Sequence, residues 1–322
     1  MAERIVMKKN MTNVNVLVET AGLSHEEWLR WRQQGIGGSD VSALLGLNPW
    51  KSELELWLEK TGQGSDMIVD NESMEWGRIM EPVIRKHFEE VTGKKVVEVH
   101  AIMQHNKYKY MIADVDGITE DDDGNPAILE IKTASEYKRS DWEDGIPAYY
   151  ETQVQHYLAV TGLEKAFIAV LIGGNTFRLY EVEADKDVRK MLVAVEASFW
   201  DKVKNNIRPE VDGSNASKEL LDKAFTGGNK EILELPDDAG KHIEAYLEAC
   251  AQADEAAAKK QEASNRLKEL LGDHEKGVLG NHVVSWSTVS SSQLDSKALK
   301  ANEPDVYNKY VKTTTSRRFS LR

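Results

Sequence analysis

Ile-Leu-Glu-Ile-Lys, residues 128–132, is a short apolar run that carries two ionisable side chains. A similar run, Met-Ile-Ala-Asp-Val-Asp-Gly-Ile at 111–118, precedes it, and the polar turn Asp-Asp-Asp-Gly-Asn at 121–125 lies between them as in a hairpin. Because side chains alternate across a strand, Glu130 and Lys132 should share one face. A buried carboxylate without a partner is costly, so these groups should be paired or bound to metal.

Asp116, Glu130 and Lys132 together supply two carboxylates and an ammonium, which is the set that a divalent-metal phosphodiesterase needs. The alternative is an ion pair on an exposed strand face. With 54 acidic and 41 basic residues in the chain, an acid-any-base triplet recurs by chance, so the triplet alone does not decide between these two.

In the catalytic interpretation, Asp116 and Glu130 are the core ligands of Mg²⁺, a hard cation that prefers oxygen. The backbone carbonyl of Ile131 is a plausible third oxygen ligand. Lys132 would orient the attacking water or neutralise developing charge. Asp114 lies two residues before Asp116, shares its face in a regular strand, and so competes with it for the metal.

Three further polar residues are candidates with ordinary alternatives. Glu81 would add a carboxylate that reaches the metal directly or through water, or it is a solvated helix acid. Gln153 and Gln155 lie two apart on one predicted helix, so at most one should face the site. Otherwise both are surface amides.

The glycine-rich loop at 35–40 precedes a predicted helix capped by Ser39 or Asp40. Such a loop exposes backbone N–H groups to an anion, and Arg32 and Ser39 could add donors to a phosphate. A lone glycine loop is weak support for this. His105 and His156 lack metal-like partners at useful spacing and are interpreted as structural.

The composition indicates a cytoplasmic protein. The chain has 322 residues, 41% of them hydrophobic, enough for a substantial core. A single cysteine, Cys250, fits a reducing compartment, and neither a signal peptide nor a membrane span is predicted. The net charge of −13 argues against general adhesion to nucleic acid, although a nuclease needs favourable charge only in its cleft.

The predicted fold class is α/β, with a mixed central sheet flanked by helices. The expected elements are strands at 13–20, 95–103, 108–118, 127–134, 166–172 and 176–183, and helices after Ser24 and Ser52 and at 74–92, 151–161 and 188–204. Ser24 and Glu27 form a capping-box pattern, and Pro82 should kink a helix or start one. Residues 63–73 are expected to be a loop.

The character of the chain changes after Pro209. We therefore predict a core at 1–208 and a C-terminal appendage at 209–322, which consists of a linker, a long helix at 239–271 and short strands. That helix has a thin apolar stripe, typical of a solvated strut or of a docking surface. From residue 295 onward the chain has seven Lys and Arg residues but only three Asp and Glu residues. This basic tail would either pair with the core sheet or line DNA.

Seven motifs in this order are similar to those of the YqaJ-type viral recombinase family, which includes the phage lambda exonuclease and belongs to the PD-(D/E)xK nuclease superfamily. The resemblance covers roughly residues 14–205. Its motifs are Trp28-Leu-Arg-Trp-Arg32, Gly35-Ile-Gly-Gly-Ser-Asp40, Leu47-Asn-Pro-Trp50, Trp76-Gly-Arg-Ile-Met-Glu81, Ala113-Asp-Val-Asp-Gly117, Leu129-Glu-Ile-Lys132 and Gln153-Val-Gln155.

The resemblance implies a PD-(D/E)xK, restriction-endonuclease-like core and Mg²⁺-dependent digestion of duplex DNA from its ends, with Mn²⁺ as an alternative metal. The strand with a 5′-phosphate would be degraded, which leaves a 3′ overhang for a single-strand annealing protein, and a ring trimer is implied. The catalytic and metal roles pass to Glu81, Asp116, Glu130 and Lys132. The 5′-phosphate contacts pass to Arg32 and Ser39, and the active-site glutamines to Gln153 and Gln155.

The sequence departs from the superfamily pattern at Val115, where a proline is usual, and this loosens the choice between Asp114 and Asp116. Residues after about 210 have no counterpart in the lambda enzyme, although longer phage relatives carry similar tails. The competing functions are a structure-selective endonuclease on the same site and a non-catalytic protein that binds a recombination partner through the helix at 239–271.

Overall fold

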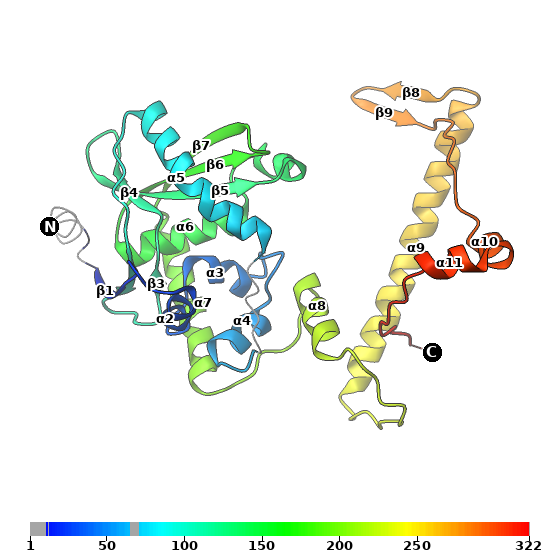
Figure 1. Ribbon diagram of the computed structural model, residues 1–322, viewed down its shortest axis with the longest axis horizontal. Coiled ribbons are helices and arrows are strands. Elements are labelled where there is room, and N and C mark those ends of the chain that lie inside the picture. Colours follow the sequence, from blue (N-terminus) through cyan, green and yellow to red (C-terminus); the bar gives the residue numbers. More distant parts are fainter. Residues whose placement is uncertain (1–10, 12, 65–70, 322) are drawn as a thin grey trace. The chain divides into compact units, whose positions relative to one another are not determined.

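The computed structural model describes residues 11, 13–64 and 71–321, and these form two units (Figure 1). The first unit ends at Ala224 and the second begins at Phe225. Part of the loop expected at 63–73 lies outside the described residues.

The first unit alternates helices and strands. Its elements are β1 (Val14–Glu19), α2 (His25–Arg32), α3 (Gly38–Leu44), α4 (Glu53–Lys60), α5 (Glu72–Thr92), β2 (Ala101–His105), β3 (Ile112–Ala113), β4 (Gly117–Glu120), β5 (Pro126–Ala134), the 3₁₀ helix η1 (Glu136–Trp142), α6 (Ala148–Thr161), β6 (Lys165–Ile172), β7 (Thr176–Glu183), α7 (Lys186–Lys204) and α8 (Asn215–Ala224).

The central sheet has the order β4-β5-β6-β7 and is mixed, because β5 and β6 are parallel while the other two pairs are antiparallel. Alternation along β5 sends Leu129 and Ile131 to the face covered by α5, where they meet Ile84 and Phe88. Ile128 points to the opposite face, which α6 covers. The expected α/β class with a mixed sheet between helices is therefore confirmed.

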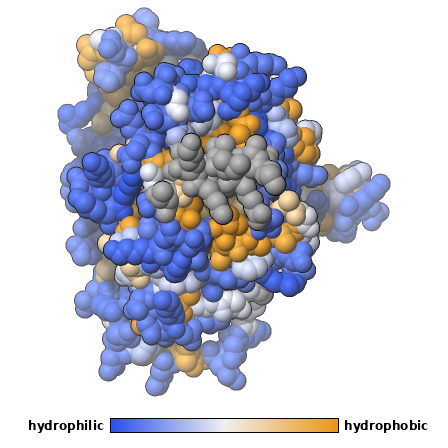
Figure 2. Space-filling view, turned by 90° about the vertical axis from the view of Figure 1, so that its left-hand side faces the viewer, coloured by the Kyte–Doolittle hydropathy of each residue, from blue (hydrophilic) through white to orange (hydrophobic). Residues whose placement is uncertain are grey.

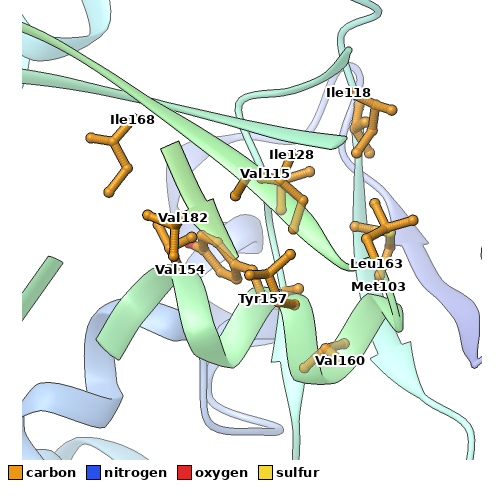
Figure 3. Packing of buried hydrophobic residues seen from close by; sticks show 14 of the residues in the cluster. Met103, Val115, Ile118, Ile128, Val154, Tyr157, Val160, Leu163, Ile168 and Val182 are labelled. Carbon is orange, nitrogen blue, oxygen red and sulfur yellow. The ribbon is translucent and has the colours of Figure 1, made fainter. Parts of the chain in front are cut away.

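Figure 3 shows how α6 packs on this sheet: Val154, Tyr157 and Val160 lie toward strand residues that include Ile128 and Ile168. All of these side chains are buried. The helix ends at Gly162, whose φ of 76° is left-handed and suits glycine. The core therefore fixes which side of α6 faces the strand that carries Glu130.

A second sheet, β1-β2-β3, lies earlier in the chain. The single strand expected at 108–118 is wrong, because residues 114–116 belong to no strand and separate β3 from β4. The strand expected at 95–103 is likewise shorter and displaced, with only an isolated bridge between Val97 and Ile118 before β2. Because residues 114–116 lie outside any strand, the side chains of Asp114 and Asp116 need not point to the same face.

Helices α3, α4, α7 and α8 build a separate core around Ile36, Trp57, Leu192 and Phe199. Leu220 of α8 also packs there, and Ser217 is buried. The prediction divided the chain between residues 208 and 209 and expected an irregular linker. The structure instead keeps α8 with the first unit, because its apolar side is buried in that unit's core.

The second unit consists of α9 (Ala239–Leu271), β8 (Lys276–Leu279), β9 (His282–Ser285), α10 (Ser296–Asn302) and α11 (Pro304–Tyr310). The long helix has the expected bounds. The strands β8 and β9 form a two-stranded antiparallel sheet. Among the hydrophobic side chains described in this unit, only Leu271 is buried. The basic tail forms no strand over 311–321.

Helix ends show where local sequence decides structure. The capping box of Ser24 and Glu27 is present, and Ser52 caps α4. The prediction that Ser39 or Asp40 caps α3 is wrong, since Gly37 is the N-cap and its N–H donates to Asp40 Oδ2 at 3.0 Å. Pro82 lies inside α5, which neither starts nor ends there.

The surface is rich in polar side chains (Figure 2), as expected for a chain in which 30% of the residues are charged. The face of the first unit in Figure 2 is mostly hydrophilic, with hydrophobic residues gathered in patches. None of the helices among the described residues is both long enough and apolar enough to span a bilayer.

Candidate active site

The centre of the site is the carboxylate of Glu130, which is 2% exposed on β5. Its Oε1 accepts a hydrogen bond from Gln153 Nε2 at 2.6 Å and pairs with Lys132 Nζ at 2.5 Å. Lys132 Nζ also lies 5.0 Å from the centre of the Tyr150 ring. Glu130 and Lys132 thus share one face, as alternation predicts, and that face lies toward α6. The pair is not an exposed surface ion pair.

Asp116 joins this centre from the interruption between β3 and β4. Its Oδ2 accepts a hydrogen bond from the backbone N–H of Ile131 at 2.7 Å. Asp114 instead accepts a hydrogen bond from Trp28 Nε1 at 2.7 Å. The expectation that the two aspartates share a face fails, because residues 114–116 are not in a strand. Of the two, Asp116 is the one tied to the strand of Glu130.

Glu81 is presented by α5 beside the same region but is engaged by arginine. Its carboxylate pairs with Arg85 one turn later, and Arg85 also pairs with Glu98 at 2.5 Å. Arg85 Nη2 lies 3.5 Å from the carbonyl oxygen of Asp116, which places this ion-pair network next to the aspartate. Glu81 is therefore near Asp116 without contacting Glu130 directly.

The three carboxylates disfavour each other's ionisation. Burial, and next the charge of Asp116, raise the pKa of Glu130 to about 8, although Lys132 acts in the opposite direction. Burial, and again Asp116, raise the pKa of Glu81 to about 7. Burial also raises the pKa of Asp116. A group of carboxylates with this arrangement is stabilised by a bound cation.

Arg32 and Ser39 meet at the glycine loop. Arg32 Nη2 donates to Ser39 Oγ at 2.8 Å, and the guanidinium lies 4.9 Å from the Trp28 ring centre. Behind them, the buried Asp40 pairs with the buried Lys60 at 2.8 Å. Burial alone would raise the pKa of Asp40, but Lys60, Arg32 and further cations hold it well below its ordinary value. Asp40 and Lys60 thus form a buried ion pair beside Arg32, the last residue of α2, and Ser39, near the start of α3.

The glycine loop lies directly against the residues that contact Glu130. A Cβ on Gly38 would lie 2.5 Å from Tyr157 Cε1 and 3.0 Å from Gln153 Cγ, so only glycine allows this approach of α3 to α6. Gln153 Nε2 in turn donates to the Tyr157 hydroxyl at 3.0 Å. The two groups of candidates, at the loop and at Glu130, therefore form one continuous region.

Gln155 does not belong to this region. Its amide nitrogen donates to the Glu183 carbonyl at 2.7 Å, and its oxygen accepts from the Asp185 N–H at 3.0 Å. The expectation that at most one glutamine faces the site agrees with this placement, whereas a catalytic role carried over to Gln155 does not. Residues two apart on a helix point in different directions.

The two histidines have structural contacts. The His156 ring bonds to Glu196 and to the carbonyl of Ile112, at 2.8 Å each. His105 Nδ1 accepts from the backbone N–H groups of Lys107 and Tyr108, at 3.0 Å each. The structural interpretation of both therefore agrees with their contacts.

Sequence reasoning missed several residues of the region. Tyr157 lies four positions after Gln153 on α6, so helical spacing could have found it. Tyr150 lies three positions before Gln153 on α6, so the same spacing could have found it, whereas Lys60 had no such signal, because its partner Asp40 lies on another helix. Only packing brings Lys60 to Asp40, or the Tyr150 ring under Lys132.

The donor set fits a divalent cation in its chemistry. Glu130 Oε2 is buried and has no hydrogen-bond partner among the described residues, so it is free to bind a cation. Asp116 and the Ile131 carbonyl would add two further oxygens of the kind that Mg²⁺ prefers. Over the described part of the chain, however, no group of three or more His, Cys, Asp or Glu side chains is assembled for a metal. Glu81 in particular is held by Arg85.

A strand hairpin that carries Glu130 and Lys132, followed by a helix and a parallel strand, defines an α/β protein with a mixed central sheet. Residues 27–164 match the YqaJ-like viral recombinase domain family. A Bacillus subtilis (strain 168) protein, YqaJ, is 42% identical over 312 residues, which are 95% of this chain and 97% of that protein. The chain belongs to the YqaJ-like family.

Two more distant similarities are weaker. Protein R354 of Acanthamoeba polyphaga mimivirus is 27% identical over 151 residues, covering 44% of this chain and 27% of that protein. The crystal structure of an alkaline exonuclease (LHK-Exo) from Laribacter hongkongensis is 19% identical, with a TM-score of 0.46 over 62% of this chain and 98% of that one.

Proposed function

We propose that this protein is a metal-dependent deoxyribonuclease that digests duplex DNA from its ends. It would degrade the strand that carries a 5′-phosphate and leave a 3′ overhang for a single-strand annealing protein. The observation that carries the proposal is the buried Glu130 carboxylate. One of its oxygens is held by Lys132 and Gln153, while the other has no partner among the described residues.

Each residue of the candidate site has its own proposed role in metal binding or catalysis. Asp116, Glu130 and the Ile131 carbonyl would hold Mg²⁺, with Glu81 as an outer carboxylate. When bound, the metal polarises the scissile phosphate and lowers the pKa of water. Gln153 fixes the Glu130 carboxylate so that Oε2 stays free. Lys132, held over the Tyr150 ring, would orient the attacking water and stabilise negative charge on the phosphate.

The terminal 5′-phosphate would be bound at the glycine loop. The Arg32 guanidinium and the exposed Ser39 hydroxyl are adjacent donors, and charge-assisted bonds to phosphate are strong. Tyr157 and Gln153 connect this loop to Glu130, so a strand end bound at Arg32 would place an early phosphodiester near the acidic centre.

The test is digestion of linear duplex DNA with either a 5′-phosphate or a 5′-hydroxyl, in Mg²⁺, in Mn²⁺ and in EDTA. We expect loss of the 5′-phosphorylated strand only with metal. Glu130→Gln and Lys132→Ala should abolish it, whereas Glu120→Gln, on the exposed end of the neighbouring strand, should not. Intact 5′-phosphorylated ends, or unchanged activity in Glu130→Gln, would sink the proposal.

Covalently closed circular DNA separates the proposal from its alternatives. An enzyme that requires ends leaves circles intact, whereas a structure-selective endonuclease on the same site cuts them. A ring trimer is part of the proposal, because enclosure of DNA would allow an acidic chain to remain bound. Sedimentation with and without DNA tests the trimer, and co-sedimentation with an annealing protein tests the partner.

A further inference from the structure

Trp50 is a large aromatic side chain that is 60% exposed yet firmly positioned. Its backbone N–H and that of Lys51 both donate to Asn48 Oδ1, at 2.8 and 3.0 Å, in an Asx turn. Asn48 is itself anchored, since its Nδ2 donates to Ser42 Oγ of α3 at 3.0 Å. An exposed indole on a rigid turn loses little conformational entropy when it binds a ligand.

A chain of aromatic contacts connects Trp50 to the candidate active site. The Trp50 ring meets Tyr149 edge-on at 5.3 Å between ring centres, and Tyr149 meets Tyr150 at 4.4 Å. The Tyr150 ring lies under Lys132 Nζ at 5.0 Å. The exposed ring is thus two side chains away from the proposed catalytic lysine.

We propose that Trp50, supported by Tyr149, is a stacking platform for a nucleobase of the DNA strand end held at the candidate active site. This rests on the proposed nuclease function. Every base presents a flat π face, so an aromatic platform binds single-stranded or frayed nucleotides without regard to sequence. It would hold the end nucleotides in line with the Glu130 and Lys132 centre, and it accounts for an indole left largely in water.

A purely structural role predicts something different. If Trp50 only fastened its turn to the start of α6 through Tyr149, its replacement would reduce stability and would affect all DNA substrates equally. A platform instead makes binding depend on one particular base. The experiment must therefore vary the base as well as the protein.

The full-length protein is titrated in EDTA with labelled linear duplexes, each lacking one base at a defined position among the end nucleotides of either strand. We expect the wild-type protein to bind about tenfold more weakly when one particular base is missing. Trp50→Ala should bind intact DNA about tenfold more weakly and show no further loss at that position. Trp50→Phe should keep part of the base dependence.

Two further variants separate stacking from folding. Trp50→Leu keeps apolar bulk without a π face and should behave like Trp50→Ala. Trp286→Ala, which removes an indole that is 51% exposed in the second unit, is the matched control and should behave like the wild type. Equal base dependence in the wild type and in Trp50→Ala would overturn the platform, and would do so even if the wild-type protein digests linear DNA. A wild-type protein that neither binds nor digests linear DNA would instead refute the proposed function.

Discussion

At the scale of the residue, the decisive feature is the buried carboxylate of Glu130, because only one of its two oxygens has partners among the described residues. Glu130 Oε1 accepts bonds from two side chains, and Oε2 has no partner among the described residues. Such an arrangement costs stability in the absence of a cation, because a buried polar atom has lost its water. The cost is consistent with a group kept for binding.

The first prediction concerns metal and stability. Mg²⁺ should raise the melting temperature of the wild-type protein, because a ligand that binds only the native state stabilises it by about 2.7 kcal/mol at one hundred times its Kd. Glu130→Gln should lose most of this response while melting no lower than the wild type in EDTA. Thermal unfolding with and without Mg²⁺ measures both. An equal Mg²⁺ response in Glu130→Gln would exclude Glu130 as a ligand.

The second prediction separates the two glutamines. Gln153→Ala should reduce kcat at least tenfold, because it releases the Glu130 carboxylate. Gln155→Ala should leave kcat within about twofold but lower the free energy of unfolding by about 1 kcal/mol, since it removes two hydrogen bonds between the Gln155 amide and the backbone of Glu183 and Asp185. Steady-state kinetics and denaturant titration of both variants give the comparison. A reversed pattern would contradict the placement.

At the scale of elements, a buried polar contact ties α6 to α7 and to β3. His156 and Glu196 are both fully buried, and the other ring nitrogen of His156 bonds to the carbonyl of Ile112. Burial alone would lower the pKa of His156, but Glu196 raises it above its ordinary value. The strand β3 leads directly to Asp114 and Asp116, so this tie helps to fix the aspartates.

The third prediction is a pH dependence of stability. Because the folded-state pKa of His156 is raised, its contribution is complete below the unfolded value of about 6.5 and is lost as pH rises through the folded pKa. Glu196→Gln should lower the free energy of unfolding by about 3–5 kcal/mol at pH 6. The difference in free energy of unfolding between the wild type and Glu196→Gln should become smaller in alkaline buffer. Urea titrations of both proteins from pH 6 to pH 10 test this, and a gap that widens with pH would refute it.

Several elements were predictable because their signals are local. A short apolar run after a polar turn located β5, and a long stretch rich in Ala, Glu and Lys located α9. The strand at 108–118 was not predictable as it stands, because the apolar pattern continues through the interruption at 114–116. The hydrogen bonds from Trp28 and Ile131 to the two aspartates oppose that pattern, and both donors come from distant parts of the chain.

At the scale of the whole molecule, the two units differ in how much they bury. The first has three hydrophobic clusters, whereas the described part of the second has a single buried hydrophobic residue, Leu271. The segment between Ala224 and α9 has no regular structure, and its Ile232 and Leu233 are 96% and 79% exposed. Stability should therefore be distributed unevenly along the chain.

The fourth prediction follows from that difference. Limited proteolysis should cut first between residues 225 and 238 and leave a resistant fragment that ends near Ala224, because exposed irregular backbone is the preferred substrate of proteases. The C-terminal fragment should then be degraded faster than the first. Mass spectrometry of the digest identifies the ends. First cuts inside α8, or a fragment that ends near residue 208, would contradict the boundary.

The sequence by itself determined the α/β class, the strand that carries Glu130 and Lys132, and the ordered motifs of the YqaJ-like family, because each of these depends on spacing along the chain. Only the tertiary structure distinguished Asp116 from Asp114 and Gln153 from Gln155, brought Arg85 to Glu98 and to the Asp116 carbonyl, and connected exposed Trp50 to Lys132. These depend on which distant side chains meet. Hydrogen bonds and packing across elements decide that, and neither leaves a periodic signal in the sequence.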